Sequence, residues 1–168
     1  MTKESSNIIS LCNILNIRYP IIMAPMFLIS NADMLIEAIN SGITGCIPAH
    51  NYRTDSEFKD AIEMIRKKAS GPIGVNLIVN KSNVKLKQQL NSCLELKVDY
   101  IITSLGSPEK IINACKPLGI KVFCDVVDVK YALKVQNLGC DAIIAVNKEA
   151  GGHAGPTPAK KLIPELVT

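Results

Sequence analysis

Six short runs rich in isoleucine and valine recur along the chain, and a longer segment with the apolar spacing of an amphipathic helix follows each one. These runs are continuously apolar rather than alternating, which is typical of strands buried on both faces of a parallel sheet. The pattern predicts an α/β fold built from six β-α units. The predicted strands are Pro20–Pro25, Ile43–Ala49, Ile73–Val79, Tyr100–Thr103, Lys121–Val126 and Asp141–Val146.

The intervening segments contain residues that commonly begin and end helices. Ser30–Asp33, Asp55 or Ser56, and Ser82–Asn83 offer side-chain caps, and Pro108 stands near the start of a further helix. The last two helical segments are Asp128–Leu138 and Pro158–Thr168. A glycine stands between a helix and the next strand at positions 42, 71, 119 and 139, where a left-handed cap is often needed.

Two architectures share this alternation of strands and helices: the open doubly wound sheet and the closed (β/α)8 barrel. The spacing alone does not choose between them. A complete barrel is typically about 250 residues long, so a chain of 168 residues would hold about the first six β-α units. We expect residues 1–168 to form a single domain, incomplete if it is a barrel, because no linker or second domain is visible.

Composition is that of an ordinary soluble globular protein, with 48% hydrophobic and 20% charged residues. The net charge is +4, and the densest basic run, Arg66–Lys68, ends a helical segment, where cations suit the helix dipole. Few aromatic residues accompany this run, so a nucleic-acid partner is not expected. No apolar stretch approaches the roughly 18 residues that span a membrane, and Met1–Asn7 lacks the apolar core of a signal peptide. These features predict a cytoplasmic protein.

The six cysteines indicate neither a metal site nor a disulfide framework. No pair has the C-x-x-C spacing of a zinc site or a redox dithiol. Cys46 and Cys124 fall in predicted strands, and Cys93 and Cys115 fall in predicted helices. We therefore expect buried free thiols in a reducing compartment, and no bound metal.

Polar residues gather where the predicted strands end, which is where parallel β-α folds place their chemistry. Both histidines of the chain, His50 and His153, follow a strand, Asn76 interrupts an apolar strand, and Asp125 lies near the end of another. Each has a structural alternative, since His50 can be an ordinary loop residue and a strand Asn or Asp can satisfy neighbouring backbone groups. The concentration at one end of the sheet favours a functional site.

The loop Glu149–Gly155 is the strongest local signal. Its three glycines around His153 leave backbone amides uncovered and permit close approach of a planar or anionic ligand. An imidazole exchanges protons near neutral pH, as a general base must. Met26 and Phe27, which follow the first strand, either cap the core or line the edge of a bound planar ligand.

Three segments in successive order, Tyr19–Met26, Gly74–Leu77 and Glu149–His153, resemble the nitronate monooxygenase family. This family was formerly called 2-nitropropane dioxygenase and includes the flavin-dependent enoyl-ACP reductases. The resemblance extends from about Arg18 to the last residue. It implies a (β/α)8 TIM barrel with FMN at the carboxyl end of the strands, which resolves the ambiguity in favour of the barrel.

The resemblance also implies roles for individual residues. His153 corresponds to the base that abstracts the substrate proton. The expected cofactor contacts are Ala24, Pro25, Met26, Asn76, Asp125, Val146, Gly151 and Gly152. The chain departs from the family pattern in two ways: Val146–Asn147 replaces an acidic or amide residue followed by glycine, and the sequence lacks the seventh and eighth strands, which contain the glycine-rich FMN phosphate site.

Three functional hypotheses follow. In the first, a nitronate passes electrons to FMN, and O2 reoxidises the reduced flavin. In the second, NADPH reduces FMN, which then reduces an enoyl thioester. In the third, the chain is an inactive barrel fragment or completes its barrel with another chain, such as a second copy, because an open barrel leaves edge strands and apolar surface to be covered.

Overall fold

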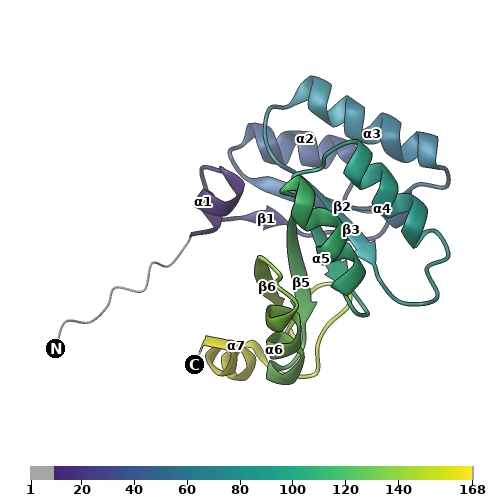
Figure 1. Ribbon diagram of the computed structural model, residues 1–168. Coiled ribbons are helices and arrows are strands. Elements are labelled where there is room, and N and C mark those ends of the chain that lie inside the picture. The colour runs from purple at the N-terminus through teal and green to yellow at the C-terminus, as the bar shows by residue number, and fades with distance from the viewer. Residues whose placement is uncertain (1–9, 168) are drawn as a thin grey trace.

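The computed structural model describes residues 10–167, which form six parallel strands alternating with helices (Figure 1). The six predicted strands are confirmed, and from β2 onward their bounds agree within one residue at each end. β1 is shorter than predicted because Pro20 and Pro25 lack the N–H that a sheet ladder needs. The strands are β1 (Ile22–Met23), β2 (Thr44–Pro48), β3 (Ile73–Ile78), β4 (Tyr100–Ser104), β5 (Lys121–Val126) and β6 (Ala142–Ala145).

The spatial order of the strands identifies the architecture. It is β1-β2-β3-β4-β5-β6, with every neighbouring pair parallel. A doubly wound sheet reverses its strand order at a switch point, and this sheet has no reversal. Because such crossovers share one hand, the connecting helices all cover the same face. The described part of the chain is therefore a curled half-barrel with β1 and β6 as its edges.

The helices after each strand agree with the pattern, with three corrections. They are α2 (Ala32–Asn40), α3 (Asp55–Lys68), α4 (Leu86–Glu95), α5 (Glu109–Cys115), α6 (Val129–Asn137) and α7 (Ala159–Val167), with short 3-10 turns η1 (Ala49–Asn51) and η2 (Lys116–Leu118). The cap of α3 is Thr54, which forms a capping box with Glu57, and not Asp55 or Ser56. The residue before α4 is Lys85, which makes no side-chain cap bond, so Ser82–Asn83 do not cap that helix. Gly71 does not adopt the left-handed conformation of the other three glycines; a Cβ there would lie 2.6 Å from Ile39 Cγ2, so close packing requires the glycine.

The sequence pattern did not predict one helix, α1 (Leu11–Leu15). Its five residues are too few to show a helical period. Leu15 of this helix joins a cluster of buried side chains on the inner face of the sheet, formed with Cys46, Tyr100, Ile102 and Phe123. We call this set the inner cluster. α1 therefore covers the amino end of the half-barrel.

Close packing inside the inner cluster depends on Tyr100. Its ring stacks on Phe123 with centroids 5.3 Å apart, and its hydroxyl donates to the Gly45 carbonyl at 2.7 Å. A Cβ at Gly74 would lie 2.3 Å from the Tyr100 ring, so the glycine makes room for the aromatic side chain. A separate and larger cluster fills the space between the sheet and its helices.

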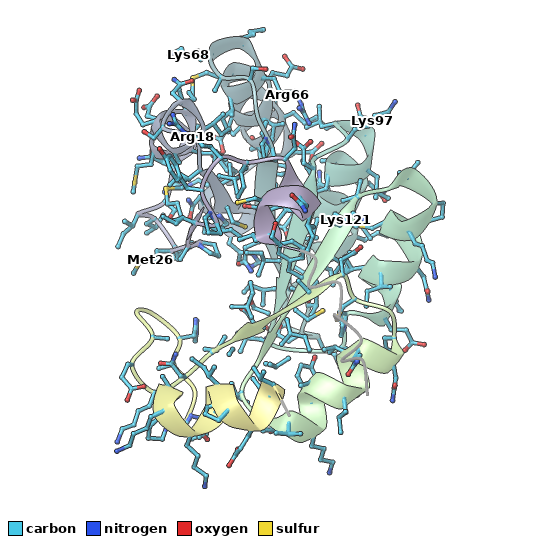
Figure 2. The ribbon with its side chains drawn as sticks, turned by 90° about the vertical axis from the view of Figure 1, so that its left-hand side faces the viewer. Arg18, Met26, Arg66, Lys68, Lys97 and Lys121 are labelled. Carbon is cyan, nitrogen blue, oxygen red and sulfur yellow. The ribbon has the colours of Figure 1, made fainter. Side chains whose placement is uncertain are left out.

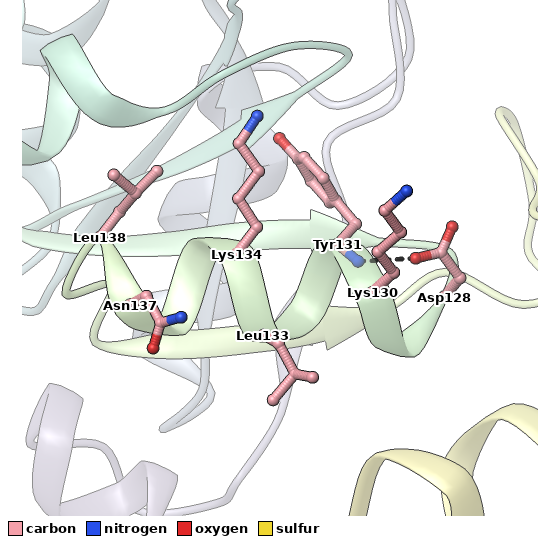
Figure 3. A pocket seen from close by; sticks show the side chains of 7 residues that line it. All are labelled: Asp128, Lys130, Tyr131, Leu133, Lys134, Asn137 and Leu138. Atoms are coloured by element: carbon pink, nitrogen blue, oxygen red, sulfur yellow. Dashed lines mark hydrogen bonds between the residues drawn. The ribbon is translucent and has the colours of Figure 1, made fainter.

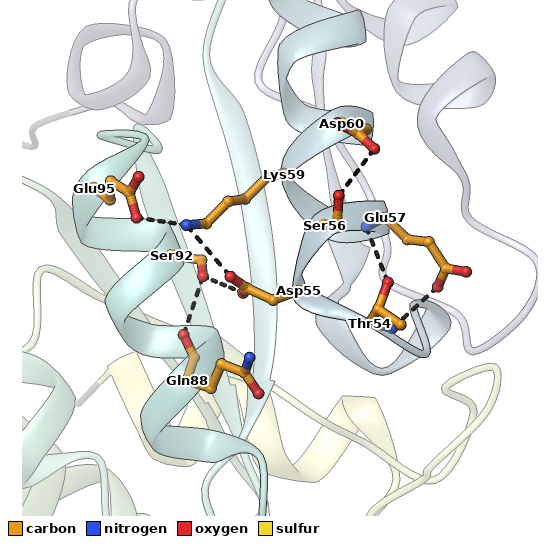
Figure 4. Close-up of polar contacts among 9 residues, drawn as sticks. All are labelled: Thr54, Asp55, Ser56, Glu57, Lys59, Asp60, Gln88, Ser92 and Glu95. Atoms are coloured by element: carbon orange, nitrogen blue, oxygen red, sulfur yellow. Dashed lines mark hydrogen bonds and ion pairs between the residues drawn. The ribbon is translucent and has the colours of Figure 1, made fainter.

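Polar contacts between α3 and α4 lie on the outer surface, away from the inner face (Figure 4). The Lys59 ammonium contacts Asp55 at 3.3 Å and Glu95 at 2.6 Å. Ser92 donates a hydrogen bond to Asp55, and this bond, with the Lys59 ammonium, lowers the pKa of Asp55. Arg66 donates to the Lys97 carbonyl at 2.7 Å. This basic helix end therefore stabilises the fold by holding the end of α4.

Cys46, Cys93, Cys115 and Cys124 are buried free thiols in the strands and helices predicted for them. Burial is the first cause that raises the pKa of Cys115, to about 11. Within residues 10–167, no helix combines the length and the apolar character needed to cross a bilayer. The signal-peptide expectation concerned Met1–Asn7, which lie outside the described residues.

Candidate active site

Three polar side chains stand at the carboxyl end of the inner face, on neighbouring strands. Side chains two residues apart on a strand share a face. Ser104 and Asp125 each lie two residues beyond a member of the inner cluster, Ile102 and Phe123, and Asn76 bonds to Ser104. The register pairs Thr103 with Cys124, which places Ser104 beside Asp125. The inner face thus changes from apolar to polar within one alternation.

These side chains form a directed chain of hydrogen bonds. Asn76 Nδ2 donates to the Ile102 carbonyl at 3.1 Å and to Ser104 Oγ at 2.8 Å. Ser104 Oγ in turn donates to Asp125 Oδ2 at 2.5 Å. Because both amide hydrogens of Asn76 are used within the sheet, Oδ1 is the atom that this buried side chain can offer to a ligand.

Asp125 has a perturbed carboxyl group. Its half-buried position raises the pKa, because burial disfavours the ionised form. The Ser104 hydrogen bond and the nearby charge of His153 lower the pKa and offset part of this rise. Val146 N donates to the Val126 carbonyl at 2.8 Å, so the loop after β6 begins beside the end of β5.

The loop after β1 is held in one conformation by two polar side chains. Ser30 Oγ donates to the Ala24 carbonyl at 2.6 Å and accepts from Met26 N at 3.0 Å. Asn51 Oδ1 accepts from Leu28 N at 2.8 Å, and its Nδ2 donates to the Ser30 carbonyl at 2.8 Å. The predicted cofactor segment Ala24–Met26 is therefore a braced backbone at the rim, and its supports Ser30 and Asn51 were not predicted.

The loop after β6 is closed at its base by backbone and side-chain contacts. Lys148 N donates to the Thr157 carbonyl at 2.8 Å, and Gly155 N donates to the Asn147 carbonyl at 3.0 Å. Asn147 Oδ1 accepts from Glu149 N at 2.8 Å, so its side chain shapes the turn. The Glu149 carboxylate accepts from Ala159 N at 2.9 Å, at the start of α7, where a negative charge suits the helix dipole.

The three glycines of this loop serve different purposes. A Cβ at Gly155 would lie 2.1 Å from the Val146 carbonyl, so this glycine is needed for packing against the end of β6. Gly151 and Gly152 have open space where a Cβ would stand, and Gly152 has φ +77°. The expectation of uncovered backbone therefore holds for Gly151 and Gly152 but not for Gly155. His153 beside them is exposed.

Because the strands are parallel, the carboxyl ends of β1, β3, β5 and β6 all lie at the same end of the half-barrel. Figure 2 shows Met26 and the loop between β6 and α7 on the same side of the molecule. His50 is exposed on η1 and takes no part in the hydrogen-bond chain. The structure thus collects at one edge the predicted residues Ala24, Met26, Asn76, Asp125 and the loop of His153.

A surface hollow also lies away from this site. It is an open groove of about 690 Å³ along the outer side of α6, lined by Tyr131, Lys134 and Leu138 among others (Figure 3). No residue of the predicted site lines it. Residues 10–167 also contain no group of three or more His, Cys, Asp or Glu side chains arranged to hold a metal ion.

Comparisons with known proteins identify the relatives of the chain. No family model matches it. The (3aS,4S,5R,7aS)-5-hydroxy-7a-methyl-1-oxo-octahydro-1H-indene-4-carboxyl-CoA dehydrogenase of Rhodococcus jostii is 24% identical over 94% of this chain and 44% of that protein. A probable nitronate monooxygenase of Staphylococcus haemolyticus is 28% identical to this chain, and the match covers 84% of this chain and 49% of that protein. The chain spans about half the length of these curated relatives.

Among solved structures, FabK from Thermotoga maritima superposes with a TM-score of 0.86 at 28% identity, covering 93% of this chain and 49% of FabK. Fold and relatives together define the class of protein that the chain resembles: the chain has the α/β architecture of barrel enzymes, and the two relatives are a dehydrogenase and a probable monooxygenase. More specifically, the predicted resemblance to the nitronate monooxygenase family is confirmed by the similarity to the probable nitronate monooxygenase.

Proposed function

We propose that this chain supplies six β-α units of an FMN-dependent barrel enzyme that oxidises alkyl nitronates with O2. The observation that supports this most strongly is that the Asn76–Ser104–Asp125 hydrogen-bond chain and the glycine loop of His153 meet at the carboxyl ends of the parallel strands. The similarity to a probable nitronate monooxygenase agrees with this proposal. Pairing of two copies through the open sheet edges stays a prediction.

The donor set and the open backbone fit a flavin. Gly151 and Gly152 leave space for a planar ring beside the backbone, and Asn76 offers a carbonyl oxygen inside an otherwise apolar strand. We propose that the backbone of Ala24–Met26 and Val146 lines the rest of the ring. When bound, FMN supplies the two-electron redox chemistry, and the protein supplies orientation and electrostatics.

His153 is the proposed base for neutral nitroalkanes. Its exposed imidazole can accept the proton from the carbon next to the nitro group, and the C–H electron pair then stays on the substrate as the nitronate. A substrate supplied as the nitronate has already lost this proton. The base is therefore needed for one form of the substrate and not for the other.

The test compares both forms of one substrate in His153→Asn. We expect kcat/KM for the neutral nitroalkane to fall by roughly 10²–10⁴-fold, the usual contribution of a general base, and turnover of the preformed nitronate to change little. His50→Asn, at the other histidine, is the matched control and should leave both unchanged. An equal loss on both substrates would remove the base assignment. NADPH consumption driven by a crotonyl thioester, without nitronate turnover, would replace nitronate oxidation by enoyl reduction.

A further inference from the structure

A small pocket opens between the starts of α3 and α4, two helices that run side by side (Figure 4). Its volume is about 270 Å³, and it lies at the carboxyl end of the half-barrel because α3 follows β2 and α4 follows β3. None of the residues proposed to contact FMN or to move a proton lines it. The lining residues are Ala49, Tyr52, Arg53, Thr54, Asp55, Phe58, Lys85, Gln88 and Gln89.

Gln89 directs a hydrogen-bond donor into this pocket. The residue is 6% exposed, and its Oε1 accepts from Asn83 Nδ2 at 2.9 Å. Asn83 Oδ1 accepts from Lys85 N at 3.1 Å, which fixes the orientation of both side-chain amides. Within residues 10–167, Gln89 Nε2 has no acceptor, and every fully shielded polar side-chain atom does have a partner. Nε2 must therefore open into the pocket, where its two hydrogens are available to a ligand that accepts hydrogen bonds.

The walls of the pocket have an excess of positive charge. They include the exposed cations Arg53 and Lys85, and the Lys85 ammonium is held there because it donates to the Arg53 carbonyl at 2.7 Å. Among the lining residues, only Asp55 is acidic, and its carboxylate contacts the Lys59 ammonium at 3.3 Å. The Glu57 carboxylate, outside the lining, accepts from two backbone N–H groups. The free charge of the walls therefore favours an anion.

The start of α4 adds backbone donors. The first N–H groups of a helix have no intrahelical acceptor, and the helix dipole gives them a partial positive charge. Lys85 stands at the capping position of this ten-residue helix and makes no side-chain cap bond. The start of α3 differs, because Thr54 and Glu57 close it with a capping box. The uncapped start of α4 is thus the one that suits an anion.

We propose that this pocket binds a phosphate group, held by the Gln89 amide, the Arg53 guanidinium and the start of α4. Phosphate oxygens accept hydrogen bonds from several directions, as these converging donors require, and the guanidinium fork matches two of the oxygens. The rings of Tyr52 and Phe58, with centroids 5.5 Å apart, give an organic group attached to the phosphate an apolar surface to contact. Binding here needs neither flavin nor turnover, so it is independent of the proposed reaction.

The test is calorimetric titration of the purified chain with inorganic phosphate and with phenyl phosphate, at constant ionic strength. We expect saturation at one phosphate per chain. Gln89→Glu keeps an acceptor for Asn83 and replaces the N–H donor by a negative oxygen, so binding should weaken at least tenfold, as for loss of a hydrogen bond to a charged group. Arg53→Gln should weaken binding by about tenfold. Lys68→Gln, at the exposed far end of α3, removes the same charge and should leave the affinity within about twofold.

A wild-type protein that binds neither probe saturably would overturn the proposal. So would an equal loss in Lys68→Gln and Arg53→Gln, because the anion would then respond to net charge and not to the pocket. Urea unfolding checks that each variant is folded, and if Gln89→Glu is not, the comparison of Arg53→Gln with Lys68→Gln decides. Phenyl phosphate that binds tenfold more tightly than inorganic phosphate supports a phosphate monoester as the ligand, and equal affinity supports free phosphate.

Discussion

The two halves of the inner face are made by the same strands and differ in almost everything else. Toward the amino end, Tyr100 and Phe123 pack with Leu15 under α1. Toward the carboxyl end, one alternation further along the same strands, Ser104 and Asp125 are hydrogen-bonded and only half-buried. A step of two residues therefore separates a closed apolar half from an open polar rim. The apolar half stabilises the sheet, and the polar rim can bind a ligand or take part in a reaction.

The largest loss of stability should come from a substitution in the apolar half. Phe123→Ala removes a side chain that is 1% exposed and stacked on Tyr100, and such truncations cost about 3–5 kcal/mol. Urea unfolding measures the loss. Leu133→Ala, at a helix position that is 54% exposed, is the control and should change little. If Phe123→Ala lowers the free energy of unfolding no more than Leu133→Ala does, the apolar half is not closely packed.

Overpacking the same half should cost somewhat less. Gly74→Ala places a methyl group 2.3 Å from the Tyr100 ring, and overpacking a core typically costs about 1–3 kcal/mol. In a double-mutant cycle, Tyr100→Leu should relieve this clash, so the double variant loses less than the sum of the two single losses. Simple additivity would contradict the close approach of Gly74 and Tyr100.

A helix cap remote from both halves provides a reference. Thr54→Ala removes the side chain that accepts from Glu57 N, and loss of such a cap costs about 1 kcal/mol. Ser56→Ala, at the serine two residues further along, should cost much less. Urea unfolding of the two variants decides which residue caps α3, and a larger loss at Ser56 would reverse the assignment.

A substitution of Asp125 in the polar rim should change the free energy of unfolding least, and in the direction opposite to the three losses above. Because the folded-state pKa of Asp125 is raised, its favourable contribution is complete below the unfolded pKa and is lost as pH rises through the folded pKa. Relative to Asp125→Asn, which stays neutral, the wild type should therefore lose stability from about pH 4 upward. Urea unfolding across this range measures the difference. A difference that is constant with pH would mean that Asp125 ionises as freely as in the unfolded chain.

Much of the fold follows from local pattern. Continuous apolar runs marked the six strands because a parallel sheet is buried on both faces, and Asn76 and Asp125 were visible as polar breaks in those runs. Contacts between distant segments leave no such local signal. Ser104 lies one residue beyond the predicted strand Tyr100–Thr103, and its bond to Asp125 depends on the register between β4 and β5.

The supports of the site were also hidden from the sequence. Asn51 braces the loop after β1 across 23 positions of chain. Glu149 is the first residue of the glycine loop, and its carboxylate accepts from Ala159 N at the start of α7 across ten positions. For Asn51, only the three-dimensional packing of β1 beside β2 brings the partners together.

The most direct test of a flavin site at the polar rim is an FMN titration of the purified protein, followed by its visible absorption spectrum and compared with Asn76→Leu. We predict the absorption bands of a bound oxidised flavin in the wild type and weaker binding in the variant, because the variant loses the one amide oxygen offered by β3. A wild-type protein that stays colourless with FMN, or a variant that binds it equally well, would contradict the account.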